Sequence, residues 1–151
     1  MSLPKDWKEF LELFNSRGVE YVVVGAVALA FHSEPRFTGD LDLLIRRNPE
    51  NAGKVLDALR DFGFASLGIT REDLLTERRV IQLGVRPNRI DLLNFLSGVD
   101  PELVWQQRVP GDLDGVPVSY IDLESFQINK RASGRERDLE DLRRFPRQDQ
   151  R

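Results

Sequence analysis

The stretch Phe37-Thr38-Gly39-Asp40-Leu41-Asp42-Leu43-Leu44-Ile45 decides how this chain folds and what it can bind, because it places two carboxylates one residue apart on a predicted buried strand. Aspartate is depleted in strands, and a buried charge has to be paired or has to hold a metal. Side chains alternate across a strand, so Asp40 and Asp42 share one face while Leu41 and Leu43 point into the core. Two carboxylates on one face predict a divalent-cation site.

A strand and a helix are predicted directly before this stretch. Residues 19–24 are β-branched and nearly all apolar, which is typical of a central strand covered on both faces. They run straight into Gly25 and the small residues of 26–31, which predict a sharp turn into a short helix. A glycine at this corner lets the backbone approach a ligand closely, and the free N–H groups of the helix point at an anion such as a triphosphate.

A third carboxylate, Asp91, falls on a later strand. Residues 79–85 and 89–95 are two short apolar runs joined by Arg86-Pro87-Asn88, a pattern that predicts a hairpin. Two metal ions about 3.5–4 Å apart would clamp the attacking and leaving oxygens of an in-line displacement, and Asp91 is placed to bind the ion on the nucleophile side or to accept the proton of an acceptor hydroxyl. The alternative is a structural aspartate that a backbone N–H or Arg89 satisfies.

The remaining elements are predicted from apolar periodicity and capping residues. Helices are expected over residues 6–17, 49–62, 100–107, 122–130 (or on to 132) and 136–145, with a last strand over 116–121. Asp114-Gly115 is expected in a loop before that strand. Residues 131–147 alternate arginines with acids, which is typical of a solvated helix face, and an RNA-binding role for the arginines is the alternative.

Composition narrows the chemistry. The chain has 151 residues, which fits one domain over residues 1–151. It has no cysteine and a single histidine, His32, so thiolate and paired-histidine zinc sites and cysteine nucleophiles are excluded, and a metal has to be bound through oxygen. His32 itself is expected to cap carbonyls at a helix end.

The net charge of −3 offers no global attraction to nucleic acid. The absence of cysteine and of a long apolar segment or signal peptide predicts a soluble, cytoplasmic protein without a membrane partner.

Taken together, Val24-Gly25-Ala26, the Asp40-Leu41-Asp42 strand and Asp91 resemble the signature of the DNA polymerase β-like nucleotidyltransferase superfamily. Residues 35–42 and 130–142 are similar to its minimal, AbiEii-like members. The resemblance implies an α+β (α/β two-layer) fold, with a palm-like mixed β-sheet, flanking helices and a C-terminal helical pair.

The same resemblance implies the activity. A nucleotidyltransferase of this kind uses Mg²⁺ or Mn²⁺ to move a nucleoside monophosphate from an NTP such as ATP to an acceptor hydroxyl on RNA, protein or a small molecule. Asp40, Asp42 and Asp91 would bind the metal and carry the catalysis, as in the reading from the residues above. The cofactor-binding positions would be Gly25, Ala26, Arg36, Thr38 and Lys130, with Lys130 contacting phosphate and with Arg36 and Thr38 supporting the site. The resemblance also suggests the toxin of a toxin–antitoxin pair, with an antitoxin protein as partner.

Two alternative functions remain open from the sequence. Ala26 stands where the family usually has glycine or serine and offers no hydroxyl to a phosphate, and the chain is small for an enzyme that also binds an acceptor. These features favour a catalytically inactive nucleotide-binding or protein-interaction module. The other alternative is metal-dependent hydrolysis of a phosphate ester by the same carboxylates.

Overall fold

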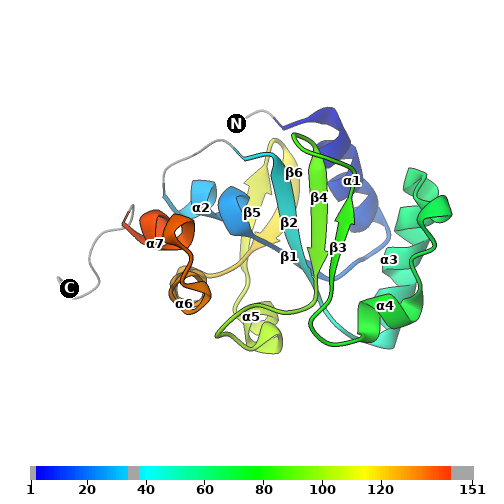
Figure 1. The fold of residues 1–151 in the computed structure, drawn as a ribbon. Coiled ribbons are helices and arrows are strands. Elements are labelled where there is room, and N and C mark those ends of the chain that lie inside the picture. Colours follow the sequence, from blue (N-terminus) through cyan, green and yellow to red (C-terminus); the bar gives the residue numbers. More distant parts are fainter. Residues whose placement is uncertain (1–2, 34–37, 144–151) are drawn as a thin grey trace.

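The computed structural model describes residues 3–33 and 38–143 of the chain. Its centre is one mixed β-sheet in the order β3-β4-β2-β1-β6-β5 (Figure 1). The strands are β1 (Tyr21–Val24), β2 (Asp40–Ile45), β3 (Val80–Leu83), β4 (Arg89–Leu93), β5 (Val109–Leu113) and β6 (Val116–Tyr120). The pairs β4–β2 and β1–β6 are parallel, and the other three neighbouring pairs are antiparallel.

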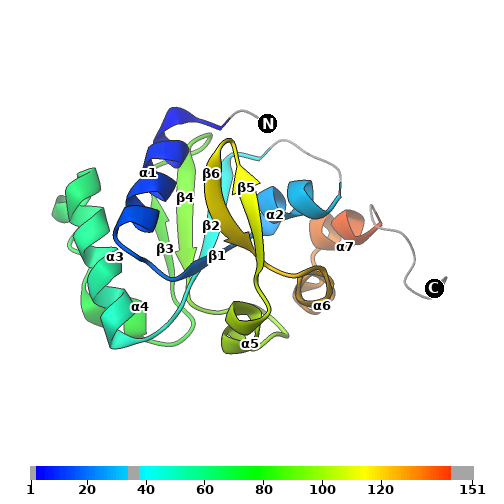
Figure 2. The same ribbon diagram turned by 180° about the vertical axis from the view of Figure 1, so that it is seen from behind.

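Helices cover the sheet on two sides. They are α1 (Lys5–Ser16), α2 (Gly25–His32), α3 (Pro49–Phe62), the 3₁₀ turn η1 (Ala65–Leu67), α4 (Arg71–Leu75), α5 (Pro101–Gln106), α6 (Leu123–Ser133) and α7 (Glu136–Leu142). Both views place α1, α3 and α4 on one side of the sheet and α2, α6 and α7 on the other (Figures 1 and 2). Among the described residues, no helix combines the length and the apolar character that crossing a membrane requires.

Most of the expected elements are present, and local chemistry explains where they end. The Asn48 side chain caps α3 by accepting a hydrogen bond from the backbone N–H of Asn51, and Gly63 ends the helix with a left-handed φ of 103°. In the same way Asp122 caps α6, accepting from the N–H of Ser125, and Gly134 ends it with a φ of 66°. The hairpin of β3 and β4 is also confirmed.

Strand β5, the short helix α4 and the 3₁₀ turn η1 were not expected from the sequence. Strand β5 was missed because its Pro110-Gly111-Asp112 segment is poor in strand-forming residues, which an edge strand tolerates. The expected loop at Asp114-Gly115 is the two-residue turn of the β5–β6 hairpin, and both of its residues have positive φ, 51° and 85°. The short helix α4, with a capping box at Thr70 and Asp73, was also missed.

Strand register positions the carboxylates. All four residues of β1 are buried, as expected for a central strand, and Val24 at its end lies opposite Asp42 of β2. On the other side of β2, Asp42 lies opposite Asp91 of β4. Because β4 and β2 run parallel in register, their acidic residues share one face of the sheet. Leu41 and Leu43, on the opposite face of β2, are fully buried, as predicted.

Candidate active site

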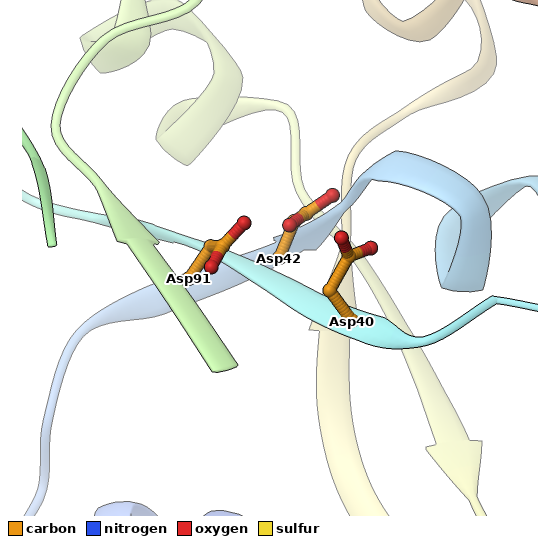
Figure 3. Close-up of side chains that lie close together, drawn as sticks. All are labelled: Asp40, Asp42 and Asp91. Carbon is orange, nitrogen blue, oxygen red and sulfur yellow. The ribbon is translucent and has the colours of Figure 1, made fainter. Parts of the chain in front are cut away.

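Three carboxylates from two neighbouring strands meet on the sheet face that α2 and α6 border (Figure 3). Asp40 and Asp42 come from β2 and Asp91 from β4, and each offers an oxygen within 4.8 Å of the others. Asp91 is buried, and the other two are partly buried. The predicted acidic triad therefore exists as a spatial cluster.

Gly25 is required at the corner between β1 and α2. Its φ of +70° is left-handed, and a Cβ atom there would lie 2.2 Å from Oδ2 of Asp42. Real Cβ atoms do not approach an oxygen so closely, so any side chain at this position would displace Asp42. The glycine predicted from the sequence thus makes room for the central carboxylate, in addition to opening the helix.

Asp40 is held by hydrogen bonds on both of its oxygens. Thr38 Oγ1 lies 3.1 Å from Oδ1, and Oδ2 accepts from Arg86 (Nη2, 3.0 Å) and from Arg89 (Nη2, 2.8 Å). Burial acts to raise the pKa of Asp40, but the hydrogen bonds from Arg86 and Thr38 and the charges of both arginines outweigh burial and lower it. Asp40 is therefore ionised at neutral pH.

The other two carboxylates are harder to ionise. Burial, together with the negative charges of Asp40 and Asp91, raises the pKa of Asp42 to about 7. Burial also raises the pKa of Asp91, although the hydrogen bond and the charge of Arg89 lower it. Mutual repulsion of this kind is what a bound cation relieves.

The donor set fits Mg²⁺ or Mn²⁺. Both ions prefer oxygen ligands, and carboxylates supply all three candidate ligands here. Oδ1 of Asp91 is buried and accepts no hydrogen bond from the described residues; its contact with the protein is an ion pair with Nε of Arg89, 2.9 Å away. Burial and the charges of Asp40 and Asp91 together raise the pKa of Asp42, and a cation held here would favour its ionised form.

A cavity of about 330 Å³ adjoins the triad, between the corner at Gly25 and helix α6. Asp42 forms part of its wall, together with Gly25, Lys130, Ser133 and Arg135. The volume falls at the lower end of small-molecule sites. The first turn of α2 begins at this wall, and the first N–H groups of a helix have no partner within it and attract anions. A second cavity, of about 310 Å³ beside α5, shares Phe95 and Leu96 with the first.

Lys130 is buried between helices α6 and α7. Its Nζ donates to Oδ1 of Asp138 at 3.0 Å and lies 3.6 Å from Oδ2 of Asp141. The expectation that this charged segment is a solvated face is therefore wrong for Asp138 and Asp141, which are 1% and 2% exposed. Their spacing of three residues places both on one side of α7, and that side packs against α6.

Replacing Asp138 by alanine is expected to destabilise the protein by about 3 kcal/mol, because Lys130 would remain buried with only the more distant Asp141 to pair with. Burial acts to raise the pKa of Asp138, but Arg135, Ser133 and Lys130 outweigh it and lower the pKa to about 2. The stabilisation is therefore present above pH 4 and is lost as the pH falls towards 2. Urea unfolding at pH 7 and pH 3 measures both effects.

Asp57→Ala is the matched control for this substitution. Asp57 pairs with Arg60 on the surface of α3, and both side chains are about half exposed or more, so we expect a change within about 0.5 kcal/mol. Equal losses of stability in Asp138→Ala and Asp57→Ala would show that the Lys130–Asp138 pair does not hold α6 and α7 together.

Comparison with known proteins identifies the family. The family model described as "Nucleotidyl transferase of unknown function (DUF2204)" matches residues 4–150. The chain belongs to this nucleotidyltransferase family. The resemblance inferred from the Gly25 corner and the Asp-x-Asp strand is thereby confirmed at the level of the superfamily.

The fold of this nucleotidyltransferase family member also has a counterpart among solved structures. It is similar to the crystal structure of a "putative nucleotidyltransferase" from Thermotoga maritima, with 16% sequence identity and a TM-score of 0.58. The similarity covers 91% of this chain and 88% of the other. At this identity it shows the fold alone, and it confirms the expected mixed sheet with flanking helices. A search of curated proteins gave no match.

The predicted nucleotide-side residues of this nucleotidyltransferase family member have different surroundings. Ala26 is buried in the first turn of α2, and Thr38 hydrogen-bonds Asp40 as a supporting residue would. Lys130 reaches the cavity wall while paired with Asp138. Arg36 lies outside the described residues. His32, kept out of the site, bonds the backbone carbonyl of Ile121 through Nε2 (2.6 Å), a carbonyl that follows β6 and does not belong to the helix end that the prediction named.

Sequence reasoning missed the two arginines on the triad and the α6–α7 part of the cavity wall. Arg89 was considered only as a structural partner of Asp91, and Arg86 only as part of a turn. The available signal was the Arg89-x-Asp91 spacing, which puts both side chains on one face of a strand. Ser133 and Arg135 lie in the stretch 130–142 that resembles the family, but only the packing of α6 brings them to the cavity, so their place at the site could not be predicted.

Proposed function

We propose that this family member is a magnesium-dependent nucleotidyltransferase that moves a nucleoside monophosphate from an NTP to an acceptor hydroxyl. The observation that supports it most is the meeting of Asp40, Asp42 and Asp91 beside a cavity that a helix N-terminus and two cationic side chains border. Carboxylates suit a cation, and the helix N-terminus with Lys130 and Arg135, both of which also contact Asp138, suits the triphosphate that the cation accompanies.

Each part of the site has a role in this proposal. A bound Mg²⁺, held by the three carboxylates, would neutralise phosphate charge and polarise the reacting oxygens. The N–H groups of the first turn of α2, with Lys130 and Arg135, orient the triphosphate. Asp91 accepts the proton of the acceptor hydroxyl, for which a raised pKa is suited. Thr38 and Arg86 hold Asp40 in the geometry that binding needs.

Incubation with each α-³²P-labelled NTP, Mg²⁺ and a cell extract tests the activity. We expect label to enter a macromolecule or a small molecule, pyrophosphate to be released in equal amount, and both to stop when EDTA is added. Transfer that persists in excess EDTA would reject the metal mechanism. Release of inorganic phosphate without pyrophosphate would favour the hydrolytic alternative.

A catalytically inactive nucleotide-binding module is the second candidate. It is favoured by the pairing of three of the expected site residues with other side chains, since Arg89 contacts Asp40 and Asp91 and Lys130 is paired with Asp138. This candidate predicts a rise in Tm with NTP and no pyrophosphate release. The acceptor class, a toxin role with an antitoxin partner, the cytoplasmic location and the single-domain organisation stay predictions.

A further inference from the structure

Arg89 lies inside the acidic cluster rather than beside it. In the register of β2 and β4, Arg89 is directly opposite Asp40, just as Asp91 is opposite Asp42. Arg89 and Asp91 are two residues apart on β4, so their side chains leave the same face of the sheet. On this face of the sheet Arg89 is therefore paired with Asp40, and Asp91 with Asp42. One of these four side chains is basic and three are acidic.

The guanidinium group of Arg89 bridges two of the three carboxylates. Nη2 donates to Oδ2 of Asp40 at 2.8 Å and to Oδ2 of Asp91 at 3.0 Å, and Nε lies 2.9 Å from Oδ1 of Asp91. The Arg89 side chain is only 19% exposed, so solvent screens these contacts weakly. Arg86 also contacts Asp40, through Nε at 3.2 Å and Nη2 at 3.0 Å, but its side chain is 58% exposed, comes from the hairpin turn and pairs with this one carboxylate of the triad.

The third carboxylate differs from these two. Among the described residues, the arginines pair with Asp40 and Asp91, and none pairs with Asp42. Asp42 is therefore the carboxylate that no arginine neutralises, and it forms part of the cavity wall. One divalent cation on that side, together with Arg89, would neutralise the three carboxylates. A second divalent cation would have to displace Arg89 from two carboxylates at once.

We propose that Arg89 is a built-in cation of the site and takes the place of one of the two metal ions, so that the protein binds a single divalent cation. This inference rests on the proposed function, because it concerns the same triad. Arginine suits the role since it stays charged at any physiological pH and its planar fork can contact two carboxylates together. Arg89 acts here as a positioning residue that holds Asp40 and Asp91 at a distance suited to one ion.

Counting bound Mn²⁺ tests this proposal without measuring activity. Free Mn²⁺ is followed by electron paramagnetic resonance while it is titrated into the protein, and circular dichroism confirms that each variant is folded. We expect one ion per chain for the natural protein and two for Arg89→Met, which removes the charge and keeps most of the side-chain length. Arg89→Lys, which keeps the charge, should return the number to one. Arg89→Gln replaces the methionine variant if that variant does not fold.

Arg60→Met is the matched control, because Arg60 pairs with Asp57 on the surface of α3 and is 65% exposed. It should bind one ion, with the affinity of the natural protein. Two ions bound by the natural protein, or one ion bound by both uncharged Arg89 variants, would overturn this proposal. Neither result would contradict the proposed nucleotidyltransferase function. Absence of binding in every protein would instead reject the metal site, and the proposed function with it.

Discussion

Asp42→Asn is expected to reduce nucleotide transfer on the order of 10³-fold, because it removes the carboxylate at the centre of the triad and with it several kcal/mol of charge stabilisation. Asparagine has the same shape, so the effect isolates the charge. The measurement is the rate of pyrophosphate release at saturating NTP and Mg²⁺. Transfer at the natural rate would show that the reaction does not depend on this cluster.

The same substitution is expected to stabilise the protein in EDTA. The pKa of Asp42 is about 7 in the folded chain, against an ordinary value of 3.8 that applies to the unfolded chain. Between pH 3.8 and pH 7, Asp42 is therefore ionised in the unfolded chain and still protonated in the folded one. Because ionisation stabilises only the unfolded chain in this range, the free energy of unfolding falls as the pH rises. The Asp42→Asn variant does not have this loss. We therefore expect its free energy of unfolding, relative to that of the natural protein, to increase by about 2 kcal/mol between pH 5 and pH 8.

Urea unfolding at the two pH values, in EDTA, measures this gain. Asp57→Asn is the control, since Asp57 is an exposed aspartate of α3 and should show no such pH-dependent difference. An advantage of Asp42→Asn that is equal at pH 5 and pH 8 would contradict the burial and repulsion that the structure places at Asp42.

Gly25→Ala is expected to damage the site more than the fold. A left-handed φ costs a residue with a Cβ atom about 1–2 kcal/mol. The larger effect is that the new Cβ would lie 2.2 Å from Oδ2 of Asp42, so this carboxylate has to move away. A misplacement of about 1 Å is enough to cost on the order of 10²-fold in rate. We expect Mn²⁺ affinity and pyrophosphate release to fall together.

Gly68→Ala separates strain from displacement. Gly68 has nearly the same φ, +68° against +70°, but a Cβ there would meet nothing within 4 Å. The two variants should therefore lose similar stability from the backbone, while only Gly25→Ala loses Mn²⁺ affinity. If Gly25→Ala bound Mn²⁺ as tightly as Gly68→Ala, the close approach of Gly25 to Asp42 would have no role in the site.

Much of the site could be predicted because its signals are local. The alternation of Asp40, Leu41, Asp42 and Leu43 assigns each side chain to a face of a strand, whatever that strand pairs with. The glycine at position 25 and the caps at Asn48 and Asp122 act within a few residues of themselves. Strand β5 was missed for the complementary reason, since its residues are poor strand formers and pairing with β6 holds them extended.

By itself the sequence determined most of the elements, the acidic face of β2, the glycine corner and the superfamily, because each depends on neighbours along the chain. Tertiary structure alone decided that Arg89 faces Asp40, since this follows from the register of two strands whose facing residues are 49 positions apart. It also decided that Asp138 is a buried partner of Lys130 and not a surface charge, because helix packing, and not composition, removes a carboxylate from water.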